Sequence, residues 1–367
     1  MKETVGIGFI GTGFARRVQI PAFLGCKGAR AVSVSSANLA NARSTAEEFS
    51  IEHYSNDWRE TIGRKDVDLV CITTPPNLHK EMVLAALEVG KHVLAEKPMA
   101  MNCDEAVEMS EAAKSTGVLS LIDHELRFLP GRQKGFELLR DGSIGKVRHV
   151  KYSFRSPNRS DPAFPWDWWS DSDAGGGTLG AINSHIIDSF NWFLGSEIAS
   201  IYCQLHTHVK KRPFKGGFRD VTTDDEANML LRFGDGELTE DATGLASVSM
   251  IEGPEYMNRI EFFGTRGAMR IDHRGDVYLA ERGEADWRAL EVDYPPGIEG
   301  LFESGFPSGF MAFAPKIVEA IRTESIGIPN AATFDDGVKV QRVLDAARES
   351  NQTGRLINLF PGTLDHT

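Results

Sequence analysis

Near its beginning the chain reads Val5-Gly6-Ile7-Gly8-Phe9-Ile10-Gly11-Thr12-Gly13-Phe14-Ala15-Arg16. The apolar run over residues 5–10 predicts a buried strand, and the residues after it predict a helix to about Leu24. Between them, Gly11 allows a tight turn, and Gly13 lets the backbone approach a pyrophosphate that the helix N-terminus attracts. The stretch therefore predicts a dinucleotide-binding turn.

The same letters also match the spacing GxGxxG when they are counted from Gly6. That phase would place the phosphate loop inside the strand, with almost no strand before it. The phase that begins at Gly11 follows the apolar run and opens the helix, so we adopt it. Its third glycine is replaced by Arg16, and taken alone the pattern is equally compatible with a chance glycine-rich turn.

Strands alternate with helices after this turn. Further strand patterns occur at residues 31–34, 67–72, 92–94 and 118–122, with helical patterns between them. Such alternation is typical of a parallel sheet with right-handed crossovers. The sequence therefore predicts an α/β protein whose residues 1–123 form a Rossmann-type domain.

The pattern changes after Asp123. Short alternating strands with turn signals fill residues 197–292, and two helical patterns close the chain near residues 309–322 and 335–350. These features predict a second α/β domain over residues 124–367, built on a large, mostly antiparallel open sheet with helices on one face.

Composition limits the function classes. The chain has 367 residues, enough for two domains, and a formal net charge of -12, which argues against nucleic acid and anionic membranes as partners. No apolar run is long enough to span a bilayer, and the first residues lack a signal-peptide layout. The four scattered cysteines form no CxxC pair, so we expect reduced thiols, a cytoplasmic protein and no metal site.

The second strand bears on the choice of cofactor. It ends at Ser35-Ser36, about 20 residues after the glycine turn, where a fold that prefers NAD usually carries an acidic residue. No carboxylate is present to repel a 2′-phosphate, and the nearest candidate to attract one, Arg43, lies a helical turn or more away. The sequence predicts NAD or NADP, with a slight preference for NADP.

Two more segments follow strand ends, where open α/β sheets bind ligands. Thr74-Pro75-Pro76-Asn77-Leu78-His79 follows residues 67–72, and Glu96-Lys97-Pro98 follows residues 92–94. A lysine at such an end can approach a bound nicotinamide ring. Taken alone, however, each segment is also compatible with an ordinary strand-to-helix turn that has no functional role.

The second half contains its own candidates. Trp166 and Trp168 lie in an aromatic, proline-rich loop that is either a hydrophobic plug between domains or a wall that stacks on carbohydrate. Gly175-Gly176-Gly177 opens a helix that carries His185, and Asp188 is placed to orient that histidine or its helix. Glu125 and Arg127 end the last Rossmann strand and should face the cleft, although Arg127 is equally suited to an interdomain ion pair.

Taken together, the order and spacing of these motifs resemble the glucose–fructose oxidoreductase/inositol dehydrogenase (Gfo/Idh/MocA) family, from about Val5 to the C-terminal helices. The resemblance implies reversible oxidation of a carbinol on a sugar, cyclitol or similar polyol, with NAD or NADP. It also implies homodimers or homotetramers built through the C-terminal sheet. The resemblance implies that Lys97 is the proton-transfer group or orients one, with His185 beside it.

The remaining site residues follow from the same resemblance. The cofactor-binding set comprises Gly11, Gly13, Phe14, Ala15, Ser35, Ser36, Thr74, Pro75, Asn77, His79, Glu96 and Lys97. The substrate set comprises Glu125, Arg127, Trp166, Trp168, Asn183 and His185. The chain departs from the family at Ala181, where many members carry an aspartate, and at Asn183, where glycine is common. The proton relay is therefore expected to shorten to Lys97 and His185.

Two alternative functions stay open: a cofactor-binding regulator without turnover, and a lyase or glycosidase that uses the cofactor transiently.

Overall fold

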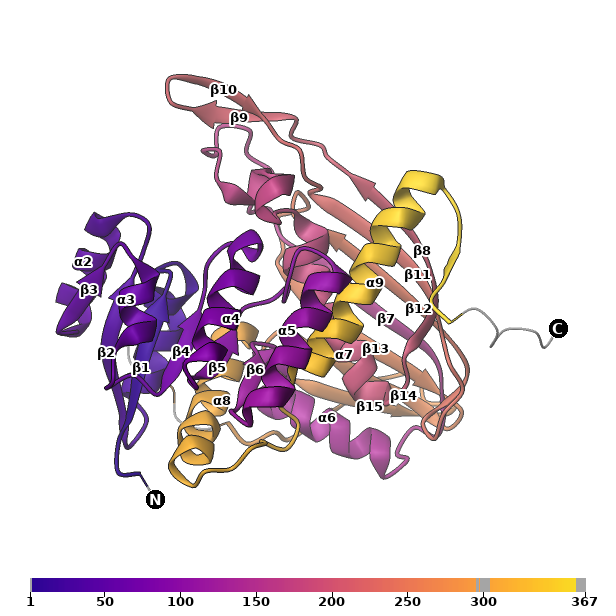
Figure 1. Ribbon diagram of the computed structural model, residues 1–367. Coiled ribbons are helices and arrows are strands. Elements are labelled where there is room, and N and C mark those ends of the chain that lie inside the picture. Colours follow the sequence, from indigo (N-terminus) through magenta and orange to yellow (C-terminus); the bar gives the residue numbers. More distant parts are fainter. Residues whose placement is uncertain (1, 295–296, 298–303, 361–367) are drawn as a thin grey trace. The chain divides into compact units, whose positions relative to one another are not determined.

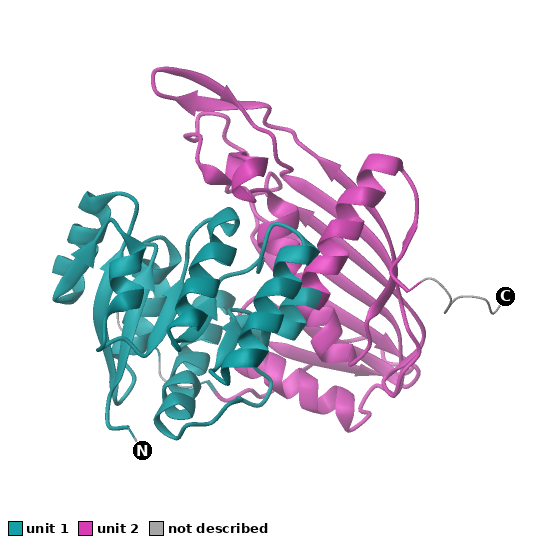
Figure 2. Cartoon of the chain, in the orientation of Figure 1, with its two compact units in different colours: residues 1–129, 294–338 teal, residues 130–293, 339–367 magenta. Residues whose placement is uncertain are grey.

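A computed structural model of the protein describes residues 2–294, 297 and 304–360 (Figure 1). It divides into two compact units (Figure 2): unit 1 comprises residues 1–129 and 294–338, and unit 2 comprises residues 130–293 and 339–367. The expected boundary after residue 123 lies near the end of the first segment. Residues 294–338, however, belong to unit 1, so that unit is built from two separate parts of the chain.

The described residues of unit 1 form a six-stranded sheet in which every neighbouring pair is parallel. The strand order is β3-β2-β1-β4-β5-β6, which reverses direction between β1 and β4, the position where doubly wound sheets bind dinucleotides. The strands are β1 (Val5–Ile10), β2 (Ala29–Ser35), β3 (His53–Ser55), β4 (Leu69–Ile72), β5 (His92–Ala95) and β6 (Ser120–Ile122). The predicted Rossmann-type sheet is confirmed, with β3 as an additional edge strand.

The phase chosen for the glycine turn is also confirmed. Gly6 and Gly8 lie inside β1, where a Cβ at Gly6 would stand 1.8 Å from the carbonyl oxygen of Asp66. A Cβ at Gly8 would stand 2.6 Å from Cγ2 of Thr61. These two glycines therefore serve packing inside the unit, and the turn begins only after Ile10.

Helices cover both faces of the sheet of unit 1. α1 (Ile20–Leu24) and α8 (Gly305–Arg322) share one apolar core, in which the Phe23 and Phe310 rings meet edge to face at 5.4 Å. α4 (His79–Glu88) and α5 (Cys103–Thr116) contribute to the core of the other face. α2 (Leu39–Phe49) begins at the predicted cap Asn38, whose side chain accepts a hydrogen bond from the Ala40 amide. The unit also contains α3 (Trp58–Gly63).

Unit 2 is built on a nine-stranded sheet within the described residues, in the order β16-β15-β14-β13-β7-β12-β11-β8-β17. Among the strands that the structure describes, only β7 and β12 pair in parallel in this sheet, so the predicted mostly antiparallel sheet is confirmed. The strands are β7 (Val147–Arg155), β8 (Ile198–His206), β11 (Glu226–Phe233), β12 (Thr239–Ser249), β13 (Met257–Gly264), β14 (Gly267–Ile271), β15 (Val277–Glu281), β16 (Arg288–Leu290) and β17 (Ile357–Asn358).

Helices lie against one face of this large sheet (Figure 1): α6 (Pro130–Arg140), α7 (Ser184–Leu194) and the part of α9 (Phe334–Thr353) that belongs to unit 2. Along β7 the residues facing these helices are buried and the alternate ones are partly exposed. A separate hairpin is formed by β9 (Lys211–Phe214) and β10 (Gly217–Asp220). In the part of the chain that the structure describes, no helix is both long and apolar enough to cross a membrane.

Candidate active site

The glycine turn of unit 1 leaves room for a ligand. Gly11 has φ of +101°, and a Cβ there would lie 2.6 Å from the Thr73 carbonyl oxygen, so only glycine fits. A Cβ at Gly13 would meet no described atom within 4 Å. The chain then enters a π-helical turn, Ala15–Gln19, that continues into α1. An open turn at the start of a helix fits a pyrophosphate, and π-helical turns are frequent at functional sites.

Ser35 and Ser36, the two residues predicted to lie near the ribose of the cofactor, differ in burial at the end of β2. Ser35 is fully buried, and its hydroxyl points to the Phe9 carbonyl oxygen at 3.5 Å. Ser36 is only half-buried and is therefore the better placed of the two to contact a ribose. Nearby, Arg16 donates a hydrogen bond to Glu48 and another to Ser44.

His79 joins two of the predicted cofactor segments. Its ring is fully buried, with Nε2 2.9 Å from the Thr74 carbonyl oxygen and Nδ1 3.1 Å from the Pro98 carbonyl oxygen. Burial lowers the pKa of His79, which favours the neutral ring. Thr74 and Pro75 are half-buried and Asn77 is exposed, so these three residues remain accessible. A neutral ring donates one hydrogen bond only, so His79 bonds one of these carbonyl oxygens and packs against the other, between the loop after β4 and the turn that carries Lys97.

Lys97 lies at the carboxyl end of the sheet, as predicted. The Glu96 amide donates to the Ile72 carbonyl oxygen, so β5 continues its pairing with β4 up to the residue before the lysine. Lys97 itself is half-buried, and its backbone amide donates to Glu96 Oε2 at 3.3 Å. The peptide bond between Lys97 and Pro98 is cis.

Three buried carboxyl groups gather beside Lys97: Glu96, Asp123 and Glu125 are 9 %, 0 % and 2 % exposed. Burial raises the pKa of each carboxyl group, and the charge of Lys97 opposes the rise in all three. Gln19 donates to Asp123 Oδ2 at 2.8 Å. Sequence reasoning missed Asp123 and Gln19, although an aspartate directly after an apolar strand was a signal for the first.

Arg127 forms an ion pair rather than presenting a free guanidinium. It lies 3.5 Å from Asp336 and donates to the Asn330 carbonyl oxygen at 3.4 Å. Burial alone would raise the pKa of Asp336, but Arg127 and the hydrogen bonds from Thr333 bring it below its usual value. All these residues belong to unit 1, so this ion pair is internal to that unit.

The triglycine turn of unit 2 is held by Asp224. Gly177 has φ of +98°, and a Cβ there would lie 2.5 Å from Asp224 Oδ1. The same carboxylate accepts the Leu179 amide at 2.7 Å, and burial raises the pKa of Asp224 to about 6. Asp224 thereby caps a second π-helical turn, Leu179–Asn183, that continues into α7.

The second π-helical turn carries the predicted substrate residues. Asn183 is fully buried, and neither its Oδ1 nor its Nδ2 has a hydrogen-bond partner among the described residues. The hydroxyls of Thr178 and Ser184 are in the same situation. His185 and Asp188 follow and are also buried. Buried polar groups without hydrogen-bond partners are unfavourable, so this segment is suited to binding a polar ligand.

The tryptophan loop contacts other parts of unit 2. Trp166 donates from Nε1 to the Asp220 carbonyl oxygen at 3.1 Å, and the Arg219 guanidinium lies 3.7 Å from its ring centroid, so it anchors the β9–β10 hairpin. Trp168 is 36 % exposed and meets Trp169 edge to face. Of the two predicted residues, Trp168 is therefore the one with a face available for a ligand.

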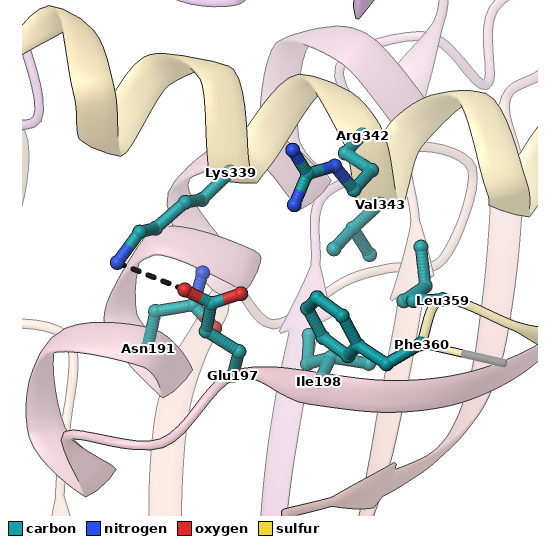
Figure 3. Close-up of a pocket in the computed structure, with 8 residues that line it drawn as sticks. All are labelled: Asn191, Glu197, Ile198, Lys339, Arg342, Val343, Leu359 and Phe360. Carbon is teal, nitrogen blue, oxygen red and sulfur yellow. Dashed lines mark ion pairs between the residues drawn. The ribbon is translucent and has the colours of Figure 1, made fainter. Parts of the chain in front are cut away.

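A small cavity elsewhere in unit 2 is not a substrate site (Figure 3). Its volume is about 10 Å³, room for about one water molecule. Lys339 and Glu197 form an ion pair at 2.9 Å at its edge (Figure 3). The cavity is lined by Asn191, Glu197, Ile198, Lys339, Arg342, Val343, Leu359 and Phe360.

The sheet order and the open glycine turn define a dinucleotide-binding protein. A family model described as an oxidoreductase family with an NAD-binding Rossmann fold matches residues 5–124, and a GFO/IDH/MocA C-terminal domain model matches residues 133–270. The chain belongs to the Gfo/Idh/MocA family of oxidoreductases.

Individual relatives agree with this assignment. A levoglucosan dehydrogenase of Pseudarthrobacter phenanthrenivorans is 28% identical over 95% of this chain and 96% of its own length. An uncharacterised oxidoreductase of Synechocystis is 30% identical over 72% of this chain and 70% of its own. The solved complex of levoglucosan dehydrogenase with NADH and L-sorbose has a TM-score of 0.87 at 26% identity, covering 98% of this chain and 99% of the other. The predicted family, fold class and enzyme class, an NAD(P)-dependent oxidoreductase, are confirmed.

Proposed function

We propose that the protein is an NAD(P)-dependent dehydrogenase that reversibly oxidises a carbinol of a sugar, cyclitol or related polyol. Lys97 is the proton-transfer group. The observation that carries the proposal is the position of Lys97 at the carboxyl end of β5, directly after a residue that still pairs with β4. A relative named levoglucosan dehydrogenase, solved with NADH and L-sorbose, supports the substrate class.

The open turn at Gly13, the end of β2 at Ser36 and the accessible residues after β4 would hold the cofactor. When bound, NAD(P) supplies the acceptor for the hydride of the carbinol carbon. The chain must then manage the hydroxyl proton. The O–H bond breaks, its electron pair stays on the substrate oxygen, and an N–H bond forms at Nζ of Lys97. In the reverse direction Lys97 returns this proton to the oxygen.

Residues 124–367 supply the substrate contacts in this proposal, and residues 1–123 hold the cofactor. The unpartnered amide of Asn183 offers both a donor and an acceptor, which suits the hydroxyl groups of a polyol. Trp168 offers an exposed aromatic face for the C–H face of a sugar ring. His185, two residues after Asn183, is the proposed group that passes the proton onward, since Ala181, one helical turn before it, has no side chain that could do so.

We further propose that NADP binds at least as well as NAD, because position 36 at the end of β2 is a serine and not an acidic residue that would repel the 2′-phosphate.

We assign oligomerisation to the face of the large sheet opposite α6 and α7. Leu230 and Tyr202, which are 56% and 39% exposed, lie on β11 and β8 of that sheet. The scattered cysteines keep the cytoplasm as the proposed compartment.

A panel of sugars and polyols that includes levoglucosan, offered with NAD and with NADP, tests the proposal. We expect the absorbance of reduced cofactor to rise with at least one substrate. Product formation without net reduction would instead indicate the lyase or glycosidase alternative. Cofactor binding with neither product nor reduction across the panel would indicate a regulator.

A further inference from the structure

We propose that Glu96 and Asp123 share a single proton and that this carboxyl–carboxylate pair limits the negative charge beside Lys97, so that the lysine can act as a base. Gln19 is the residue that positions the pair. The inference rests on the proposed role of Lys97 and deepens it, because it assigns positioning residues to the same site.

The two carboxyl groups meet because their strands are neighbours. β5 and β6 pair in parallel up to Ala95 and Ile122, and the Asp123 amide donates to the Ala95 carbonyl oxygen at 2.8 Å. Glu96 and Asp123 are thus the next residues on two adjacent strands, and both carboxyl groups are buried there. An ionised carboxylate only accepts hydrogen bonds, so a bond between two carboxyl groups requires a proton on one of them.

The remaining contacts indicate where that proton lies. Gln19 donates to Asp123 Oδ2, whereas Asp123 Oδ1 and Glu96 Oε1 have no hydrogen-bond partner among the described residues, and a proton shared between the two acids would satisfy both. Gln19 is itself fully buried, and its Oε1 is also without a partner there. Asp123 is the more deeply buried acid of the two, and burial raises its pKa well above the usual range. Asp123 is therefore the holder of the shared proton.

The groups that face the pair come from three further places: Lys97 on the same turn, Glu125 after β6 and Cys71 on β4. Burial, followed by the charges of Asp123 and Glu96, raises the pKa of the Cys71 thiol, which stays neutral. Burial also raises the pKa of Glu125 and favours its neutral form. The described residues contain no His, Cys, Asp and Glu group suited to a metal ion, so the acids are not explained as ligands.

The consequence for Lys97 is a matter of charge. Three ionised carboxylates beside an amine would favour its ammonium form, which cannot accept a proton. With one shared proton and a neutral Glu125, a single negative charge remains. That charge is enough to orient Lys97 and to balance the ammonium that forms when it takes the hydroxyl proton.

The first test does not depend on turnover. Infrared difference spectra of the whole protein at neutral pH compare wild type with Asp123→Asn, whose amide can donate a hydrogen bond to Glu96 but cannot share a proton with it. We expect the carbonyl stretch of an un-ionised carboxylic acid to be lost in the variant. Asp68→Asn is the matched control, since Asp68 precedes β4 at the opposite end of the sheet and accepts the Gly6 amide, and it should lose only carboxylate bands. The neutral Glu125 keeps its own band in both proteins, so a difference spectrum in which no acid band is lost from Asp123→Asn would overturn the inference.

The second test is the pH profile of kcat/KM. In wild type the shared proton is lost as pH rises, and the second negative charge then holds Lys97 as ammonium. Asp123→Asn cannot undergo this ionisation, so the ratio of its kcat/KM to that of wild type should rise with pH. A merely structural role would lower kcat/KM by the same factor at every pH, and that result would refute the pair.

The two proposals fail in different ways. Full activity of a Lys97 variant would overturn the proposed function and, with it, the role given to the pair. Absence of the infrared difference while a Lys97 variant is inactive would overturn the shared proton alone.

Discussion

Lys97 is the residue on which the proposed chemistry depends. Lys97→Met keeps the bulk of the side chain but removes the group that takes the proton, so we expect kcat to fall by at least roughly 10²-fold, the low end for general acid–base catalysis. Cofactor affinity, measured by fluorescence titration, should change little. Lys65→Met, at an exposed position of the same unit, is the control. Near-normal turnover of Lys97→Met on an identified substrate would make His185 the leading candidate base.

A second prediction at this scale concerns Ser36. An aspartate at the buried Ser35 would introduce a carboxylate into the sheet core, so the informative change is Ser36→Asp. A carboxylate there can accept the ribose 2′-hydroxyl of NAD and repels the 2′-phosphate of NADP. We expect the ratio of the NADP to the NAD dissociation constant to rise at least about tenfold, a free-energy difference of about 1.4 kcal/mol. An unchanged ratio would show that the 2′-position lies elsewhere.

Single residues also show where sequence reasoning stops. The position of Lys97 after the end of a strand was predictable because an apolar run ends just before it. The engagement of His79 with two backbone carbonyl groups was not, because one of them belongs to the turn at Pro98, which only the fold brings near. Asp123 and Gln19 were missed for the same reason, since their contact joins residues that are distant in the chain.

Among the elements, the two π-helical turns are the least predictable feature. Each begins a helix that the apolar pattern predicts, and each ends in a fully buried amide side chain, Gln19 or Asn183. The wider turn shifts the register by a fraction of a turn, which a short apolar pattern does not detect. Strand β3 was missed because His53-Tyr54-Ser55 has neither length nor an apolar run.

The cap on the second π-helical turn predicts a pH dependence of stability. The folded pKa of Asp224, about 6, exceeds the ordinary value of an aspartate, so the folded state binds this proton more tightly than the unfolded chain. Its contribution to stability is therefore complete below pH ~4 and is lost as pH rises towards ~6.

Asp224→Asn keeps an oxygen for the Leu179 amide but does not titrate. We expect the variant to gain stability over wild type between pH ~4 and ~6, by on the order of 1 kcal/mol because Asp224 is partly exposed. Urea denaturation across this range measures the difference, with the exposed Asp173→Asn as control. Parallel stability curves would show that Asp224 is not the titrating group.

At the scale of the whole molecule, the large sheet offers the surface for self-association. Leu230 is 56% exposed on β11, on the face opposite the helices of unit 2. If that face forms the dimer, Leu230→Asp places a charge in a desolvated contact and should raise the dissociation constant of the dimer at least about tenfold. Light scattering after size-exclusion chromatography measures this. Ile326→Asp, at an apolar residue of unit 1 that is 83% exposed, should leave the mass unchanged.

Which segments of the chain make up each compact unit was the least predictable feature of the whole molecule. The last long helices could be inferred from their local apolar patterns, but the return of residues 294–338 to unit 1 depends on which apolar surfaces pack best. The same holds for the parallel pairing of β7 with β12, which join residues far apart in the chain.

The place of α8 in unit 1 has a consequence for synthesis on the ribosome. The β-strands of the Rossmann sheet all emerge before residue 123, but α8 brings the partners of Phe23 and Phe128 only at residues 305–322. The nascent sheet must therefore wait, with one apolar face incomplete, while the whole of residues 130–293 is translated. Domain-by-domain folding from the N-terminus is not open to this chain, and unit 1, although first to be made, is among the last to be finished.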